Sequence, residues 1–206
     1  MHGLNFYRSL RIVFFQLWPF YCHEQTAGPY KRGKNGDDSV RCSLRYGGSQ
    51  VVSLFPFVGK LLRLLSKQGS IQLAIASRSP DETAARGILD TLGLLDLFCC
   101  LQIYSGSKAT HFKAIQTCTG LPFRKMLFFD DERANIEAVA KLGVCCLHVG
   151  KEIGLTPGAV QAGFKKYREA CLSRSSLQKW LQPREDVCPK SVTSKRGVMN
   201  QHVFDV

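Results

Sequence analysis

Acidic side chains directly follow one of the most apolar short stretches of this chain. Residues 126–129 are Met-Leu-Phe-Phe, and Asp130, Asp131 and Glu132 come next. Four apolar residues, two of them aromatic, predict a strand that is buried on both faces. Carboxylates at the carboxyl end of a parallel strand lie where open α/β sheets bind ligands, and Mg²⁺ prefers oxygen ligands of this kind. The pattern indicates a magnesium site, although acids also occur here simply because they stabilise the positive end of a helix dipole.

Two earlier predicted strands are also followed by polar residues that suit phosphate chemistry. Ser77 and Arg78 come at the end of one strand, and Lys108 comes shortly after the next. A hydroxyl and the amides of a helix start can hold a phosphate, and a lysine can offset its charge. Taken singly, Ser77 could equally cap a turn and Lys108 could be one more surface lysine. Their order on three successive strands predicts that they meet the paired acids at one edge of a sheet.

Strand-like and helix-like segments alternate through the middle of the chain. Repeated strand–helix units with short turns predict an α/β fold with a doubly wound, Rossmann-like parallel sheet. The helix after the second strand is expected to begin with Ser79 as its N-cap and Pro80 at its first position. The apolar segment 11–17 is a further candidate strand. The expected strands are 71–77, 98–104, 126–129 and 145–149, and the expected helices are 57–66, 79–92, 110–119 and 130–143.

The chain of 206 residues is long enough for one domain with a substantial core. We expect residues 1–166 to form this core. Residues 24–48, rich in Gly, Lys, Asp and Ser, are predicted to be an inserted loop or hairpin. Later the periodicity gives way to Ser, Arg, Lys and Pro, which predicts a basic, disordered tail over residues 167–206.

The net charge of +12 lies mostly towards the two ends. Residues 1–50 carry seven basic and three acidic side chains, residues 51–150 carry eleven and eight, and residues 151–206 carry ten and five. A basic end could contact nucleic acid or an anionic membrane. No basic patch interleaved with aromatic residues accompanies it, so we expect solvated charge and neither kind of partner.

The cysteines and the apolar start of the chain bear on the compartment. Cys99-Cys100 and Cys145-Cys146 are adjacent pairs, whose side chains point to opposite faces of a strand, and no Cys-x-x-Cys spacing occurs. Reduced, buried thiols in a cytoplasmic protein explain them best. The apolar run 12–22 raises the question of a signal peptide. Polar Gln16 and Pro19 interrupt this run, however, and no small-residue cleavage site follows it.

The strand-end motifs resemble motifs two, three and four of the haloacid-dehalogenase-like phosphatases. Five segments are similar to the small eukaryotic magnesium-dependent phosphatases of that superfamily, and the resemblance covers about residues 17–164. It implies a Rossmann-like core with a minimal cap, and a phosphorylated small molecule, such as a sugar or glycated amine, or a phosphotyrosine protein as substrate. It also implies that Ser77, Arg78 and Lys108 bind the substrate phosphate and that Asp131, with Asp130 beside it, binds Mg²⁺. We expect a monomer. The five segments are 17–20, 76–78, 94–98, 103–112 and 128–133.

The start of the chain departs from the pattern of this family. The family begins with a strand ending in Asp-x-Asp-x-Thr, whose first Asp attacks phosphorus and whose second is the general acid/base. Counting back from Leu17 assigns Ile12 and Phe14 to these two positions and Gln16 to the threonine. Ile and Phe can do neither task, so the motif is missing and we predict little or no hydrolysis. An alternative first exon or an incorrectly assigned start would explain the loss of resemblance upstream of Leu17.

The two function classes left open are a Mg²⁺-dependent phosphatase and a non-catalytic homologue that binds a phosphorylated ligand or a protein. Two other residues invite a catalytic interpretation. Cys118 and Arg124 have the Cys-x5-Arg spacing of cysteine-dependent tyrosine phosphatases, but Cys118 ends a predicted helix, whereas a reactive thiolate needs a helix start. His111 could be an acid, although a lone histidine on a helix is more often structural.

Overall fold

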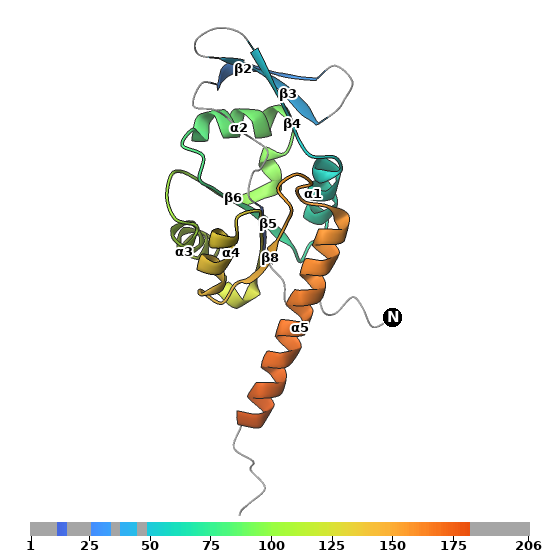
Figure 1. Ribbon diagram of the computed structural model, residues 1–206, viewed down its shortest axis with the longest axis vertical. Coiled ribbons are helices and arrows are strands. Elements are labelled where there is room, and N and C mark those ends of the chain that lie inside the picture. Colours follow the sequence, from blue (N-terminus) through green and yellow to red (C-terminus); the bar gives the residue numbers. More distant parts are fainter. Residues whose placement is uncertain (1–11, 16–25, 34–37, 45–48, 182–206) are drawn as a thin grey trace, which may run out of the picture.

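Five parallel strands form the central sheet of the computed structural model, which describes residues 12–15, 26–33, 38–44 and 49–181 (Figure 1). The order across the sheet is β6-β5-β1-β7-β8, and all four neighbouring pairs run parallel. This confirms the doubly wound α/β fold and the candidate strand within residues 11–17. The strands are β1 Ile12–Phe15, β5 Gln72–Ser77, β6 Phe98–Ile103, β7 Met126–Asp130 and β8 Cys145–His148.

Helices cover both faces of this sheet, as the continuous apolar strands require. Successive strand residues alternate between two buried clusters: Leu73 and Ile75 pack in one, and Ala74 and Ala76 in the other. The first cluster includes side chains of α1, α2 and α5, and the second those of α3 and α4. The helices are α1 Val58–Ser66, α2 Glu82–Thr91, α3 Lys108–Thr119, α4 Arg133–Ala140 and α5 Pro157–Leu181, with 3₁₀ turns at η2 Leu95–Leu97 and η3 Phe123–Lys125.

The insertion between β1 and α1 is a small antiparallel sheet in the order β2-β3-β4. Within residues 24–48, the described strands β2 and β3 pair antiparallel, and β4 pairs with β3 and extends the sheet to residue 53. Figure 1 shows this sheet above α2, and Gly87 of α2 leaves room for the ring of Tyr30, which a Cβ there would meet at 2.2 Å. The first of the two buried clusters also contains Val40, Cys42 and Val52 from this small sheet. The strands are β2 Thr26–Arg32, β3 Ser39–Leu44 and β4 Ser49–Ser53.

Helix α5 corrects the predicted boundary at residue 166. It runs without interruption to Leu181, and Tyr167 is only 4% exposed. Val160, Phe164, Tyr167 and Cys171 pack on the core at helical spacing, a stripe that the surrounding Lys, Arg and Ser residues obscure in the sequence. Gly163 lets the helix approach β7 closely. Of the predicted disordered tail, residues 167–181 are therefore helical, and residues 182–206 lie outside the described part.

Helix α2 begins later than its sequence suggests. Its N-cap is Asp81, whose carboxylate accepts a hydrogen bond from the backbone N–H of Ala84 at 2.8 Å. Ser79, the predicted N-cap, instead accepts a longer hydrogen bond of 3.4 Å from the Asp81 N–H. Asp is as good an N-cap as Ser, so the sequence signal alone does not separate two candidates spaced two residues apart.

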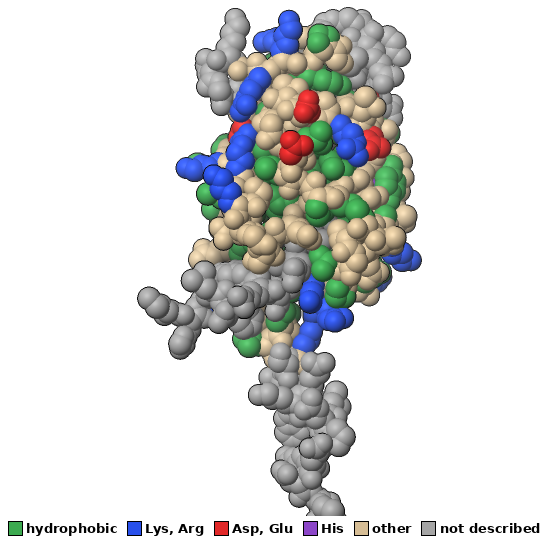
Figure 2. Space-filling view, turned by 180° about the vertical axis from the view of Figure 1, so that it is seen from behind, with side chains coloured by type: hydrophobic (Ala, Val, Ile, Leu, Met, Phe, Trp, Pro, Cys, Tyr) green, Lys and Arg blue, Asp and Glu red, His purple; other side chains and the backbone are tan. Residues whose placement is uncertain are grey.

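The surface carries scattered charge. On the face seen in Figure 2, Lys and Arg side chains lie at both edges and towards the foot of the molecule, and a few acidic side chains lie in its upper half. Within the described ranges, no helix is both long enough and apolar enough to cross a membrane. The seven cysteines in these ranges are all free thiols, and Cys145 and Cys146 pack on opposite faces of the sheet as expected.

Candidate active site

The candidate site lies where the carboxyl ends of β5, β1 and β7 meet. Chain order along the sheet runs from β1 outwards through β5 and β6, and then resumes on the other side with β7 and β8. Open α/β sheets bind ligands outside the carboxyl ends of the strands at such a reversal. Strand β1 is level with both neighbours up to Phe15, which pairs with Ile75 and Phe129. Ser77 and Asp131 follow two residues beyond these partners, so both belong to this edge.

Lys108 reaches the site from the first residue of α3. Ser107 is the N-cap, and its hydroxyl accepts a hydrogen bond from the Thr110 N–H at 3.1 Å. The Lys108 side chain is buried, its Nζ donates to the Ala76 carbonyl, and the same nitrogen lies 3.6 Å from Asp130 Oδ2. Burial lowers the pKa of Lys108 from 10.5 to about 8, although the Asp130 carboxylate acts in the opposite direction. Lys108 therefore links the ends of β5 and β7.

Asp130 is fully engaged by protein groups. Its Oδ1 accepts hydrogen bonds from the Glu132 N–H at 2.7 Å and from Asn135 Nδ2 at 3.1 Å. Its Oδ2 accepts from the same Asn135 nitrogen at 3.2 Å and faces Lys108. Burial raises the pKa of Asp130, against the effects of Lys108 and of these hydrogen bonds. Asp130 thus has a structural role in holding the turn, whatever else it contacts.

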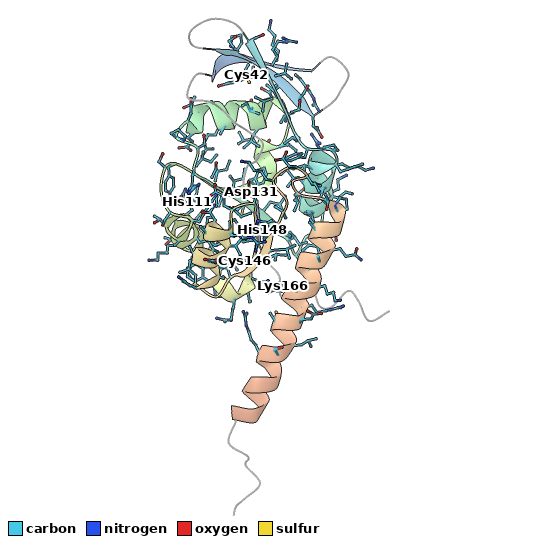
Figure 3. All side chains as sticks on the ribbon, viewed as in Figure 1. Cys42, His111, Asp131, Cys146, His148 and Lys166 are labelled. Atoms are coloured by element: carbon cyan, nitrogen blue, oxygen red, sulfur yellow. The ribbon has the colours of Figure 1, made fainter. Side chains whose placement is uncertain are left out.

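Asp131 has the opposite character. Its Oδ1 is buried and has no hydrogen-bond partner among the residues that the structure describes. Its backbone carbonyl lies 2.9 Å from His148 Nε2 at the end of β8, and Figure 3 shows the two residues next to each other in the middle of the molecule. A buried carboxylate oxygen without a partner is costly unless a cation or a proton donor completes it. Of the two acids predicted to bind metal, Asp131 is the one with an oxygen to spare.

Ser77 and Arg78 end β5 differently. Ser77 is buried, and its hydroxyl accepts a hydrogen bond from the Ser79 N–H at 3.2 Å. Arg78 turns towards β7, where its Nη2 donates to both carboxylate oxygens of Glu132 at 2.8 Å. Glu132 also accepts from Asn135 Nδ2 at 3.3 Å. The cation predicted to bind phosphate is therefore paired with a carboxylate from across β1.

Two further candidates lie away from this chemistry. Cys118 is exposed and sits ten residues after Lys108 in α3, so about 15 Å further along the helix axis. His111 is fully buried and its ring stacks on Tyr104 with centroids 4.2 Å apart. Its ring nitrogens lie 2.7 Å from the Ser107 carbonyl and 2.9 Å from the Tyr104 carbonyl. His111 holds the turn before Lys108, which is the structural role expected from the sequence.

Comparison with known proteins decides the family. The family model described as Acid Phosphatase matches residues 13–170. The human Magnesium-dependent phosphatase 1 is 36% identical over 166 residues, which cover 80% of this chain and 89% of that protein. This chain belongs to the acid phosphatase family. A haloacid-dehalogenase-like hydrolase superfamily protein of Schizosaccharomyces pombe is 30% identical over 150 residues, covering 68% of this chain and 84% of that protein. The resemblance to magnesium-dependent phosphatases is thereby confirmed.

A solved structure agrees on the fold. The N-terminal, phosphatase-domain part of a Bacteroides fragilis protein, crystallised with Mg, superposes with a TM-score of 0.50 at 17% identity. The match covers 74% of this chain and 39% of that one. At this identity the likeness shows only that the acid phosphatase family member described here has the same Rossmann-like fold.

Strand β1 contains the two positions that the resemblance assigns to the Asp-x-Asp motif. Ile12 pairs with Met126 and Phe14 with Phe128, so they lie four and two residues before the level of Asp130. Phe14 is the residue before the last one of β1, Phe15.

Sequence reasoning did not foresee roles for Glu132 and Asn135. Asn135 is 6% exposed and, with Val139 four residues later, forms the buried side of α4. A polar residue on the apolar stripe of a short helix, directly after a pair of acids, is the signal that could have identified it. Glu132 offered no such signal, because its partner Arg78 is distant in the sequence.

The donors present suit Mg²⁺ in part. Within the described ranges, no three His, Cys, Asp or Glu side chains lie close enough together to hold a metal ion. Mg²⁺ commonly binds through one or two carboxylates, with water and substrate phosphate completing the shell. The free oxygen of Asp131 meets this need, and the buried ammonium of Lys108 nearby would face the phosphate.

Proposed function

We propose that this chain binds a phosphorylated ligand together with Mg²⁺ at the carboxyl edge of its five-stranded sheet, and that it hydrolyses the ligand slowly or not at all. One observation carries the proposal. The Lys108 ammonium and the unpartnered Asp131 oxygen flank the end of a strand, Ile12–Phe15, that contains no carboxylate. The groups that would bind phosphate and metal are present there, whereas a carboxylate that could attack phosphorus is not.

Each side chain has a distinct task in this proposal. Lys108, Arg78 and the Ser77 hydroxyl bind the phosphate oxygens, with the lysine supplying a charge that solvent does not screen. Asp131 provides a ligand to Mg²⁺, which would neutralise phosphate charge and orient its oxygens when bound. Asp130 keeps Lys108 in place, so any contact it makes to the metal is secondary to that role.

Hydrolysis is the competing function, and family membership is the observation that favours it. The acidic side chains nearest the start of the chain are Glu24, Asp37 and Asp38, so β1 has none. Asp130 and Asp131 come from another strand, and Asp130 is already held by Asn135 and Lys108. A carboxylate in such a position cannot attack phosphorus in line while it also holds the site together.

Binding and turnover are measured separately on the purified chain. Addition of Mg²⁺ and inorganic phosphate together should raise the melting temperature, since a ligand at 100 times its Kd stabilises by about 2.7 kcal/mol. Asp131→Asn should abolish this shift. Asp90→Asn, at an exposed site near the end of α2, should retain it as the matched control. No shift in the unmodified chain, or an equal shift in Asp131→Asn, would refute the binding site.

Turnover is tested with an aryl phosphate. We expect Mg²⁺-dependent phosphate release far below enzyme rates, and about 1 s⁻¹ or more would contradict the non-catalytic part of the proposal. The double variant Ile12→Asp with Phe14→Asp should not create activity, because these two residues pair with Met126 and Phe128, which precede the carboxyl end of β7. It should also lower stability, since carboxylates inside a sheet lack partners. Activity in the double variant would show that β1 can shift towards the edge.

The substrate class and the compartment are also part of the proposal. The family resemblance supports a phosphorylated small molecule or a phosphotyrosine protein as ligand, and a chain that acts as a monomer. The seven free thiols of the described ranges are what a reducing, cytoplasmic environment maintains.

A further inference from the structure

Two polar links join the carboxyl end of β5 to the carboxyl end of β7, on either side of β1. One link is Lys108, which contacts the Ala76 carbonyl on one side and Asp130 on the other. The other is the ion pair of Arg78 with Glu132, here called the Arg78–Glu132 bridge. Because β1 lies between β5 and β7, a phosphate held at the end of β1 would lie close to both links.

The carboxylate side of the Arg78–Glu132 bridge is anchored more firmly than the arginine side. The Glu132 N–H donates to Asp130 at 2.7 Å, and its carboxylate accepts from Asn135 at 3.3 Å. Asn135 in turn donates to both oxygens of Asp130. Within the described part of the chain, Arg78 Nη2 donates hydrogen bonds to the Glu132 carboxylate alone. The arginine is therefore the member that can move.

Both members of the bridge are accessible to solvent. The side chain of Arg78 is 46% exposed and that of Glu132 is 39% exposed. An ion pair of this exposure is weak, because water and salt screen it. A phosphate that offers the arginine a charge-assisted, bidentate contact can therefore displace the carboxylate. Opening the bridge would therefore cost little free energy.

We propose that Glu132 is a built-in competitor for phosphate at Arg78, so that the Arg78–Glu132 bridge must open before a phosphorylated ligand is fully bound. This inference rests on the proposed function, because it assumes that phosphate binds at the end of β1. It assigns Glu132 to the control of affinity, not to catalysis. A dianionic phosphate is also repelled by the Glu132 carboxylate, which Asn135 keeps at the site after Arg78 has left.

The test compares Glu132→Gln with Glu82→Gln by titrating inorganic phosphate in the presence of Mg²⁺. The pair of Glu82 with Arg86 is a matched control, since it is also half-exposed and has a contact of 2.7 Å, but lies on α2. Glu132→Gln should bind phosphate about two- to fivefold more tightly, the range that an exposed ion pair allows. Glu82→Gln should bind like the unmodified chain. Equal or weaker binding in Glu132→Gln would overturn the proposal, because Glu132 would then orient Arg78 for phosphate.

A second background shows whether the effect acts through Arg78. In the Arg78→Gln variant, adding Glu132→Gln should change phosphate affinity by less than about half of its effect in the unmodified chain. A full effect there would mean that Glu132 acts only as a general negative charge, which also overturns the proposal.

Ligand-free stability separates failure of the bridge from failure of the proposed function. A double-mutant cycle on Arg78 and Glu132 should show coupling in urea denaturation without phosphate. Additive effects would mean that the bridge does not form. If coupling is present but no variant binds phosphate, the proposed function fails, and the role of Glu132 as competitor fails with it.

Discussion

The buried pair of Lys108 and Asp130 makes a quantitative prediction for Asp130→Asn. Both side chains are 0% exposed and 3.6 Å apart. Asn keeps the size of the side chain and an acceptor for the Glu132 N–H, so the substitution mainly removes the charge that faces Lys108. Removing one member of a buried pair usually costs about 3–5 kcal/mol. A smaller loss is expected here, since Lys108 can escape the cost by releasing its proton.

The size of the loss follows from the pKa of Lys108. Burial depresses it from 10.5 in the unfolded chain to about 8 in the folded chain, with Asp130 present. Without Asp130 the pKa of Lys108 falls further, so the neutral amine becomes more favoured in the folded state. At pH 7, below the folded pKa, the charge that Lys108 then loses was favourable by an amount on the order of 1 kcal/mol. At pH 9 the folded lysine is already mostly neutral in the unmodified chain, so the same loss is close to zero.

The sign of the pH dependence is therefore fixed. A lysine with a depressed folded pKa makes the unmodified chain gain stability as pH rises from about 8 to 10.5, since the unfolded chain then binds more protons. Asp130→Asn should destabilise the protein by about 1 kcal/mol more at pH 7 than at pH 9. Urea denaturation at both pH values, with a chelator present, measures this difference.

The control is the same substitution in a Lys108→Met background. In that background the extra loss at pH 7 should shrink, because the lysine that loses its partner is gone. A loss that is the same at both pH values in the unmodified background would refute the reasoning. So would a pH difference of undiminished size in the Lys108→Met background, because it would have another source.

Three further outcomes are expected. Gly87→Ala should lower the free energy of unfolding by about 1–2 kcal/mol, because its Cβ would meet the Tyr30 ring at 2.2 Å. Gly69→Ala is the control and should cost little, since the space around Gly69 is open. Equal effects of the two substitutions in chemical denaturation would contradict the contact with Tyr30. Phe57→Gly should raise the free energy of unfolding by up to about 1 kcal/mol, because the φ of 71° at Phe57 strains any residue but glycine and the ring is 65% exposed. A loss of stability would show that the Phe57 ring makes stabilising contacts. Cys118→Ser should leave phosphate binding unchanged in the titration described above, and a clear loss would restore Cys118 as a site residue.

Local patterns were sufficient for much of the fold. The strands that end at Ser77 and Asp130 were predicted to within one residue, because short buried strands are continuous apolar runs bounded by polar turns. The convergence of their ends followed from the strand–helix alternation, which permits few topologies. The disposition of Cys145 and Cys146 on opposite faces followed from the period of two alone.

Where the sequence offered two equivalent signals, or a weak one, the expectation failed. Ser79 and Asp81 are equally good N-caps by residue type, and in the structure Asp81 is the one that caps α2. The length of α5 depends on apolar residues such as Tyr167 that are spaced among many cations, and only the facing surface of the sheet makes them a buried stripe. The level of β1 against β5 and β7 is likewise a property of the whole sheet, because a run of four apolar residues does not specify which residues of the neighbouring strands it pairs with.

The residue types at each strand end were therefore determined by the sequence: a buried-strand carboxylate pair, a lysine at a helix start, and a serine and an arginine after β5. Which of these groups remain available was decided by the tertiary structure alone. Asp130 is engaged, Asp131 keeps a free oxygen, and Arg78 is paired with Glu132, 54 residues away. Pairings over such separations depend on which strands are neighbours, and the free energy that selects the neighbours comes from burying the whole sheet.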